Sequence, residues 1–237
     1  MFNRWFPARR AMRRRKRAAA ATGAGRDKFA DCRSLLPGVE APVVIDGGAA
    51  GGATIRRLRE VWPHALVHAF EVLPERLGQL QRKYADDPKV TIHGQALGDS
   101  ACELAFHVTA NRDSSSALRP GRVSAAQHGD AVAITHTITV PQVRLDQVIT
   151  TPVDLLKLDL QGYELAALRG ADGLLPRTKL VLCEVEFVPL YEGQPLFGDI
   201  AAHLRERGFR LHNLYDLWTL ESGQLTSGDA LFVSERR

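Results

Sequence analysis

Short apolar runs alternate with longer amphipathic runs along most of the chain, from residue 43 onward. Continuous apolar runs are typical of buried strands, whereas apolar residues three or four positions apart are typical of helices. The apolar runs predict strands at 43–45, 66–70, 90–93, 155–158, 180–185, 209–214 and 230–233. The amphipathic runs predict helices at 54–62, 74–84, 164–169 and 200–207.

This alternation predicts an α/β protein with a Rossmann-like sheet of seven mostly parallel strands and helices on both faces. Residues 100–150 interrupt the pattern. Residues 104–108 and 134–139 are typical of exposed or edge strands, and the polar stretch 109–131 separates them. We expect a β insertion here, which either lies over a site as a lid or is a surface excursion without a role.

Acidic residues stand at the ends of several predicted strands. Asp46, Glu71, Asp159 and Glu184 each close an apolar run. The carboxyl ends of parallel strands lie at one edge of a sheet, which is where α/β proteins bind their ligands. The topology therefore predicts that these four carboxylates converge on one rim, and this is the first indication of a functional site.

The turn after the first strand is rich in glycine, reading DGGAAGG over residues 46–52. Such a turn lets the backbone approach a ligand and directs the first amides of the next helix at it. Glu71 ends the following strand, where a carboxylate can accept hydrogen bonds from both hydroxyls of a ribose. This arrangement suits NAD and S-adenosylmethionine equally, although the turn lacks the G-x-G-x-x-G spacing of nicotinamide enzymes. Asp99, after the third strand, either accepts from an adenine amino group or only forms a turn.

Five sequence blocks follow one another in a recognisable order. They are VIDGGAAGG at 44–52, AFE at 69–71, VRLDQV at 143–148, DLLKLDLQGYELAALRGA at 154–171 and LCEVE at 182–186. Together they resemble the FkbM family of S-adenosylmethionine-dependent methyltransferases, and the fourth block resembles that family's Lys-x-Asp-x-x-Gly-x-Glu signature most closely. The resemblance implies a class I methyltransferase fold. Ala50 stands where the family commonly has asparagine, and Val72 where it commonly has proline.

The resemblance implies methyl transfer from S-adenosylmethionine to a hydroxyl oxygen of a small molecule, such as a sugar, a polyketide or a lipid-like product. The residues expected to bind the cofactor are Asp46, Gly47, Gly48, Ala49, Gly52, Glu71, Val72, Leu97, Asp99 and Asp159. An alcohol loses its proton during such a transfer, so a base or a metal is expected nearby. The catalytic candidates are Asp159, Lys157, Glu184 and Glu164.

Asp159 is the first of these candidates, because it ends a central strand at the methionine end of the expected cofactor site. Lys157 lies two residues earlier, so it shares a strand face with Asp159 and can keep that carboxylate ionised. Glu164 begins a helix, where an acid also favours the helix dipole, so its role is either catalytic or structural. Glu184 and Glu186 extend the acidic cluster. Such a cluster can hold Mg²⁺, but the sequence alone does not commit the site to a metal.

The positive charge is concentrated at the N-terminus. Residues 1–28 hold ten Lys and Arg residues and one acid, a net charge of +9, so residues 29–237 hold 21 basic and 26 acidic residues, a net charge of −5. We predict a basic, disordered tail over 1–28 and one methyltransferase domain over 29–237. The alternative is a binding module whose tail, with its aromatic residues beside a basic run, recruits a membrane surface or a nucleic acid.

The expected partner of the domain is a small-molecule hydroxyl acceptor, and the oligomeric state is left open. No specific nucleic acid is expected, because Asp159-Leu160-Gln161-Gly162 replaces the Asn/Asp-Pro-Pro-aromatic turn of enzymes that methylate bases. The acidic body also disfavours a broad phosphate-binding face. Three widely spaced cysteines predict a reducing, cytoplasmic environment, and no apolar run is long enough for a transmembrane helix.

Overall fold

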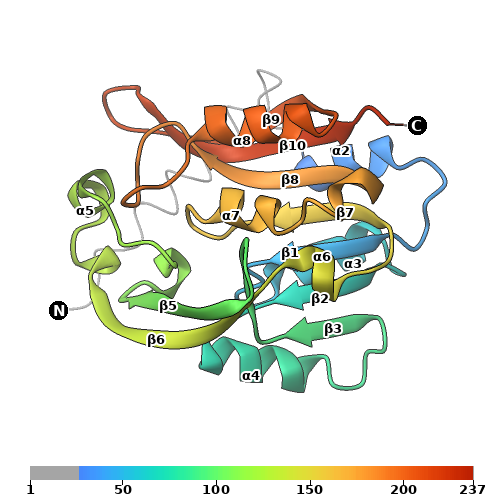
Figure 1. The fold of residues 1–237 in the computed structure, drawn as a ribbon, viewed down its shortest axis with the longest axis horizontal. Coiled ribbons are helices and arrows are strands. Elements are labelled where there is room, and N and C mark those ends of the chain that lie inside the picture. Colours follow the sequence, from blue (N-terminus) through green and yellow to red (C-terminus); the bar gives the residue numbers. More distant parts are fainter. Residues whose placement is uncertain (1–26, 237) are drawn as a thin grey trace.

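A seven-stranded sheet forms the centre of the protein (Figure 1). The structure is a computed structural model that describes residues 27–236. Across the sheet the strands are β3 (Val90–His93), β2 (Leu66–Phe70), β1 (Val43–Gly47), β7 (Val153–Leu158), β8 (Thr178–Glu186), β10 (Leu225–Ser234) and β9 (Phe209–Thr219). β10 is antiparallel to both of its neighbours, β8 and β9, and the other strand pairs of this sheet are parallel. The predicted α/β fold with a mostly parallel sheet is therefore confirmed.

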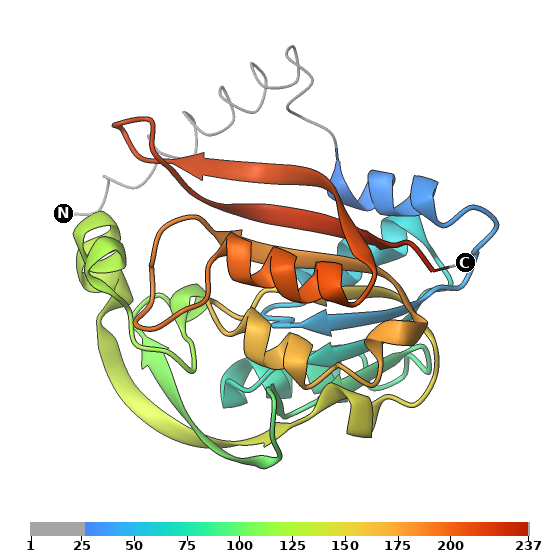
Figure 2. The ribbon, with the colours of Figure 1, turned by 45° about the horizontal axis from the view of Figure 1, so that its top comes forward.

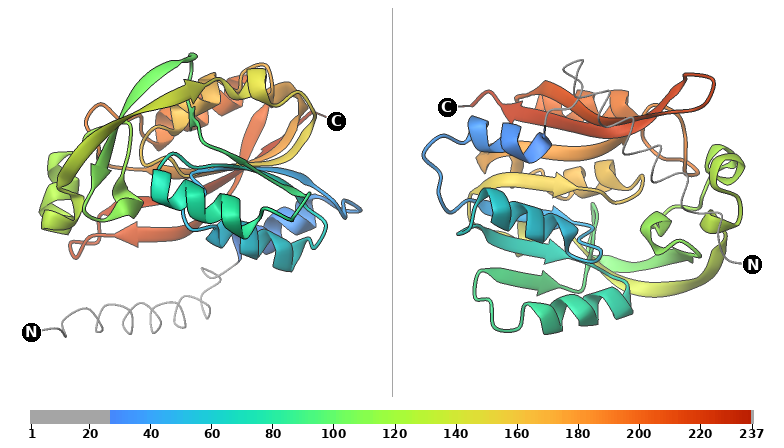
Figure 3. Two further views of the ribbon diagram at one scale, coloured as in Figure 1. Left: turned by 90° about the horizontal axis from the view of Figure 1, so that it is seen from below. Right: turned by 180° about the vertical axis from the view of Figure 1, so that it is seen from behind.

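Helices cover both faces of this sheet, as the view along its edge shows (Figure 3, left). One face carries α2 (Lys28–Leu35), α3 (Ala53–Val61) and α4 (Pro74–Lys83). The other carries α6 (Leu145–Val148), α7 (Glu164–Arg169) and α8 (Phe197–Glu206), and the short 3-10 helix η3 (Leu175–Arg177) precedes β8. Figure 2 shows α7 and α8 lying against the sheet.

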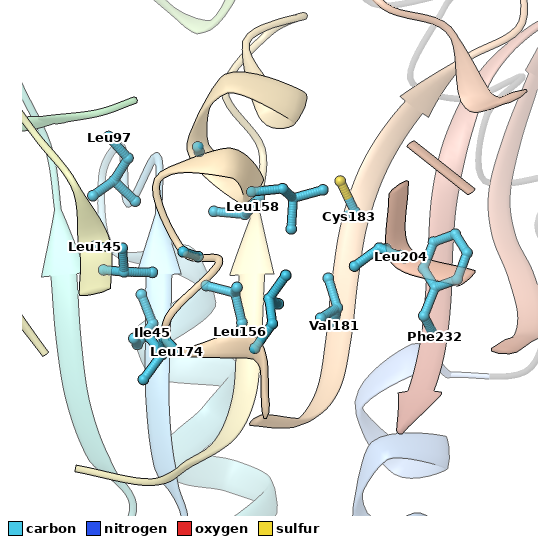
Figure 4. Packing of buried hydrophobic residues seen from close by; sticks show 14 of the residues in the cluster. Ile45, Leu97, Leu145, Leu156, Leu158, Leu174, Val181, Cys183, Leu204 and Phe232 are labelled. Carbon is cyan, nitrogen blue, oxygen red and sulfur yellow. The ribbon is translucent and has the colours of Figure 1, made fainter. Parts of the chain in front are cut away.

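Each face of the sheet has its own hydrophobic core. Leu156 and Val181 of the sheet pack with Leu204 of α8 on one side, and all three are almost fully buried (Figure 4). Ile55 and Leu58 of α3 pack with other buried side chains on the opposite side. Burying such side chains supplies the main driving force for folding, and it fixes the strand ends at one rim.

The insertion, residues 96–143, lies beyond the carboxyl ends of the first three strands (Figure 1). It contains β4 (Ala96–Leu97), β5 (Cys102–Thr109), η1 (Arg112–Ser114), α5 (Arg122–His128), η2 (Gly129–Val132) and β6 (Ile134–Val143). β4, β6 and β5 form a separate three-stranded sheet in that order. Gly121 N donates to Leu190 O at 2.7 Å and Glu192 N donates to Arg119 O at 2.8 Å, so the insertion is bound to the segment after β8.

Asp27 and Lys28, the last two residues of the predicted tail, are part of the described structure. Asp27 caps α2 by accepting from Phe29 N and Ala30 N, and it pairs with Arg57. Lys28 pairs with Asp229 of β10. The remainder of the predicted tail, residues 1–26, lies outside the described residues, and so does the membrane or nucleic-acid contact expected of it. Within residues 27–236 no helix is long and apolar enough to cross a membrane.

Candidate active site

A cavity of about 300 Å³ lies between the carboxyl ends of the central strands and the insertion. Its lining residues fall within 48–54, 70–76, 95–97, 104–117 and 157–163. They therefore come from the turns after β1, β2, β3 and β7 and from the insertion. The volume is at the lower end of the range typical of ligand pockets.

The sheet topology explains the place of this cavity. β1 pairs with β2 on one side and with β7 on the other, and both pairs are parallel. The chain runs from β1 outward to β2 and β3, and returns across the sheet to β7. At such a switch point the turns after two adjacent strands diverge and leave a crevice, in which doubly wound proteins bind ligands.

Lys157 is the cation at the floor of the cavity. Its Nζ lies 3.0 Å from Asp46 Oδ1 and 3.7 Å from Asp159 Oδ2. It also donates to the carbonyl oxygens of Gly47 and Gly48, each at 3.3 Å. Asp46 is fully buried beneath it, whereas Asp159 lines the cavity. Lys157 thus joins the end of β1 to the end of β7.

The protonation states of these three groups depend on one another. Burial alone would lower the pKa of Lys157, but Asp46 and Asp159 outweigh it and raise that pKa well above its ordinary value. Burial raises the pKa of Asp46 against the attraction of Lys157. Burial would also raise the pKa of Asp159, but Lys157 and the hydrogen bond from Gln161 lower it overall. Asp159 is therefore an ionised carboxylate facing the cavity.

Gly48 is required by packing inside the protein. Its φ is +77°, and a Cβ atom there would lie 2.0 Å from the carbonyl oxygen of Asp159. Only glycine lets the turn after β1 approach the turn after β7 this closely. We expected these glycines to let the backbone approach a ligand. Gly48 does line the cavity, but its clearest constraint is its protein neighbour.

Glu71 lies at the end of β2, in another part of the cavity wall. Its side chain is mostly buried, and its Oε1 accepts from Leu73 N at 2.8 Å. Burial raises the pKa of Glu71, against the hydrogen bond from Leu73 and the charge of Arg76. Val72 and Leu97 also line the cavity and add apolar surface. The carboxylate is therefore held in one orientation beside an apolar wall.

The structure brings seven of the predicted site residues into the cavity lining. They are Gly48, Ala49, Glu71, Val72, Leu97, Lys157 and Asp159. Asp46 and Gly47 support the lining from below through Lys157. Gly52 begins α3 with φ +74°, where a Cβ atom would lie 2.9 Å from Leu80 Cδ2, so it serves helix packing.

Asp99 does not line the cavity, so the structure does not bring it together with the other cofactor-binding candidates. Its side chain is exposed, and its carboxylate accepts only from the neighbouring Ser100. Its carbonyl oxygen accepts from Arg144 at 2.8 Å. The chain turns outward at this point because Gly98 packs against Gln142 and Gly170. The turn interpretation of Asp99 therefore agrees with its geometry.

Glu164 and Glu184 do not line the cavity either. Glu164 is buried, and its Oε1 accepts from Leu160 N at 2.5 Å, which braces the turn before α7. Burial raises the pKa of Glu164 to about 7. Glu184 contacts the site indirectly, because its Oε2 accepts from Gln161 Nε2 at 2.7 Å. A catalytic contact by Glu164 is not supported by this placement.

Several cavity residues have no signal in the sequence. Arg76 of α4, Arg112 of η1 and Phe106 of β5 line the cavity because the insertion folds back over α4. Arg76 pairs with Asp113 at 2.6 Å across this contact. Gln161 also lines the cavity. It lies inside the sequence block that resembles the family signature, so only that block could have identified it.

The described residues contain no group of three His, Cys, Asp or Glu side chains arranged to hold a metal ion. Glu186 is buried with one unpartnered carboxylate oxygen, and Gln194 is buried with an unpartnered amide nitrogen. Burial and nearby carboxylates raise the pKa of Glu186 to about 9. The acidic cluster therefore contains protonated carboxyl groups at neutral pH.

Comparisons with known proteins agree with this geometry. Residues 46–211 match the model of the Methyltransferase FkbM domain. The 2-O-methyltransferase NoeI of Sinorhizobium fredii (strain NBRC 101917 / NGR234) is 24% identical over 163 residues, which cover 65% of this chain and 67% of that protein.

Two solved structures share the fold. Methyltransferase FkbM from Methylobacillus flagellatus KT superposes with a TM-score of 0.54 at 16% identity, over 82% of this chain but only 44% of that chain. The chain thus spans less than half of that protein. Magnesium protoporphyrin IX methyltransferase (ChlM) from Synechocystis PCC 6803, solved with bound SAM, superposes with a TM-score of 0.51 at 13% identity, over 99% of this chain and 86% of that chain. Because the family model spans well over half of the sequence, the chain belongs to the FkbM methyltransferase family.

Proposed function

We propose that this protein transfers the methyl group of S-adenosylmethionine to a hydroxyl oxygen of a small molecule. The observation that carries the proposal is a single cavity with Glu71 at the end of one strand and the Lys157–Asp159 pair at the end of another. The curated relative NoeI is a 2-O-methyltransferase, which supports a hydroxyl acceptor. A sugar, a polyketide and a lipid-like alcohol are the acceptor classes to test.

The lining residues fit the two ends of this cofactor. Glu71 has a buried carboxylate oriented by Leu73 N, which suits hydrogen bonds from ribose hydroxyls. Val72 and Leu97 supply apolar surface for a purine ring. Asp159, ionised beside Lys157, suits a positively charged amino group or an acceptor hydroxyl. The turn at 48–50 presents backbone to the same cavity.

The chemistry needs alignment and the loss of one proton. When bound, S-adenosylmethionine supplies an electrophilic methyl group: the O–CH₃ bond forms as the S–CH₃ bond breaks, sulfur keeps the electron pair, and the hydroxyl proton is released. Asp159 would accept that proton, because it is a carboxylate of the lining that Lys157 keeps ionised at the end of β7. Lys157 would hold Asp159 in place and in its charged form. Leu104 and Phe106 of β5 would exclude water from the opposite wall.

The test is transfer of a labelled methyl group from S-adenosylmethionine to a panel of sugars, polyketides and long-chain alcohols. We expect a labelled methyl ether from at least one class, and an Asp159→Asn variant that binds the cofactor but transfers methyl at least about 100-fold more slowly. Label found only on an amine, a carbon or a carboxylate would contradict the proposal. Full activity in the Asp159→Asn variant would contradict the role of Asp159.

A further inference from the structure

Gln161 has a backbone conformation that its residue type rarely adopts. Its φ is +57°, and Gly162 follows with φ +93°, so the chain reverses sharply after β7. Non-glycine residues seldom occupy this region, and those that do are concentrated at functional sites. Gln161 lines the cavity. The strained turn therefore holds this side chain at the site.

The amide of Gln161 joins two carboxyl groups. Its Nε2 donates to Asp159 Oδ1 at 2.9 Å and to Glu184 Oε2 at 2.7 Å. An amide nitrogen carries two hydrogens, so both bonds form together. One nitrogen in contact with both oxygens places Asp159 and Glu184 beside each other. The ionisation of one carboxyl group opposes that of a neighbouring carboxyl group, so the two titrate as a pair.

Two further contacts fix Gln161 from outside the strand ends. Ser116 Oγ, buried in the insertion, donates to the carbonyl oxygen of Gln161 at 2.8 Å. The hydroxyl of Tyr191 donates to Gln161 Oε1 at 2.8 Å and lies 3.1 Å from the carbonyl oxygen of Ser114. A flipped amide would place Oε1 against two carboxyl groups and lose the hydroxyl donor, so these partners select one orientation of the amide.

We propose that Gln161 is a positioning residue that holds Asp159 and Glu184 as a carboxyl pair sharing one proton, and that it ties this pair to the insertion. The proposal deepens the proposed O-methylation and rests on it. Asp159, the member that lines the cavity, takes the proton of the acceptor hydroxyl. Glu184 keeps the shared proton, and Gln161 keeps both groups at fixed separation.

The electrostatic environment agrees with this assignment. Burial and the negative charge of Asp159 raise the pKa of Glu184 well above its ordinary value. Burial would raise the pKa of Asp159, but Lys157 and the Gln161 amide lower it. The other charged or titratable groups that interact with the pair are Asp46 of β1, Glu164 of α7, Cys183 and Glu186 of β8, Tyr191, Asp229 of β10 and Lys28 of α2.

The test is a pH titration of the side-chain carboxyl carbons by carbon-13 NMR, in the full chain with S-adenosylhomocysteine present. Asp159→Asn and Glu184→Gln assign the two signals. We expect two separate steps for the pair, one below and one above the ordinary range. In Gln161→Gly, which keeps the left-handed turn without strain, we expect the lower step to move up by about one pH unit, because the carboxylate loses a donor.

Gln161→Gly also separates positioning from folding. Glycine suits the turn, which offsets part of the cost of the lost side-chain hydrogen bonds, so we expect a folded protein with a cooperative thermal transition. Ala50→Gly is the matched control: it replaces another non-glycine residue with positive φ, and the side chain it removes carries no charge. This control should leave both steps in place. Independent titration of Asp159 and Glu184, or an unmoved lower step in Gln161→Gly, would overturn the proposal. The titration needs no acceptor, so its result is separate from success or failure of the methyl-transfer assay.

Discussion

Lys157 is the single residue on which the cavity floor depends most. It neutralises Asp46, a fully buried carboxylate whose partner in the structure is the Lys157 ammonium. Removing one member of a buried ion pair leaves an uncompensated charge in a medium of low polarity, which costs far more than the pair itself contributes. The same residue holds Asp159 ionised, so the stability of the floor and the chemistry of the site have a common origin.

We expect Lys157→Met to lower the free energy of unfolding by about 3–5 kcal/mol, because Asp46 loses its countercharge. Urea denaturation at neutral pH measures this. Lys179→Met is the matched control, since Lys179 forms an ion pair with Asp154 at 2.8 Å but is mostly exposed. Exposed pairs contribute at most about 1 kcal/mol. A small loss of unfolding free energy in Lys157→Met, similar to that in Lys179→Met, would contradict a large contribution of the buried Lys157–Asp46 pair to stability.

Ala50 offers a second prediction at this scale. Its φ is +47°, a conformation that costs a non-glycine residue about 1–2 kcal/mol. Ala50→Gly removes that cost but increases the entropy of the unfolded chain, so we expect a net gain in unfolding free energy of about 0.5–1 kcal/mol. Ala202→Gly, in the middle of α8, should instead lower the free energy of unfolding by about 1 kcal/mol. Thermal unfolding of both variants measures these changes. A lower free energy of unfolding in Ala50→Gly would contradict backbone strain at Ala50.

The sequence predicted the site residues that stand at strand ends. Asp159, Lys157 and Glu71 could be placed because strand periodicity and parallel topology determine where a strand ends and which side it faces. The sequence could not place Arg76 and Arg112 in the site, because their position depends on how the insertion packs against α4. The position of Asp99 outside the cavity lining could not be predicted either, because a turn residue can point either way and the packing of Gly98 against Gly170 determines the direction.

At the scale of elements, the predictions were most accurate where one apolar run made one buried strand. Residues 66–70 and 90–93 were predicted to the residue as β2 and β3. The outer strand β9 extends to Thr219, beyond the predicted end at residue 214. An irregularity at Asp216, with φ +47°, interrupts the strand alternation there, and Leu217 and Trp218 beyond it are exposed. Helix α2 was missed, since it is only 8 residues long and depends on the Asp27 cap and on Phe29 and Cys32 packing against α3.

Glu164 begins α7, and it gives the protein a pH dependence of stability. Burial raises its pKa from 4.5 to about 7. Between these values the unfolded chain has lost the proton while the folded chain keeps it, so stability falls as pH rises. Between these two pKa values, each rise of one pH unit lowers the free energy of unfolding by about 1.4 kcal/mol.

Glu164→Gln keeps the acceptor for Leu160 N and is uncharged in both states. Relative to the unaltered protein, we expect this variant to gain about 3 kcal/mol of unfolding free energy between pH 4.5 and 7, the span over which Glu164 differs between the folded and unfolded chains. Denaturant titrations at several pH values measure the difference. A constant difference between the two proteins across this range would show that Glu164 is ionised in the folded state.

At the scale of the whole molecule, strand order places the chemistry. β1 lies between β2 and β7, so the turns that carry Glu71 and Asp159 flank one crevice. The insertion lines this crevice from the other side. Family membership indicates methyl transfer as the reaction but does not specify the acceptor. Under the proposed function, we expect the insertion to influence which acceptors enter, and the sequence pattern does not specify how the insertion packs.

The most direct test of this account is a calorimetric titration with S-adenosylmethionine, S-adenosylhomocysteine and NAD. We predict micromolar binding of both adenosyl ligands and no binding of NAD. Glu71→Ala should weaken the binding of S-adenosylhomocysteine by about 1.5–3 kcal/mol, the scale of hydrogen bonds to a charged group. Glu60→Ala, an acid on α3 that does not line the cavity, should leave the affinity unchanged. Binding of NAD alone, or an unchanged affinity in Glu71→Ala, would contradict the assignment of this cavity to S-adenosylmethionine.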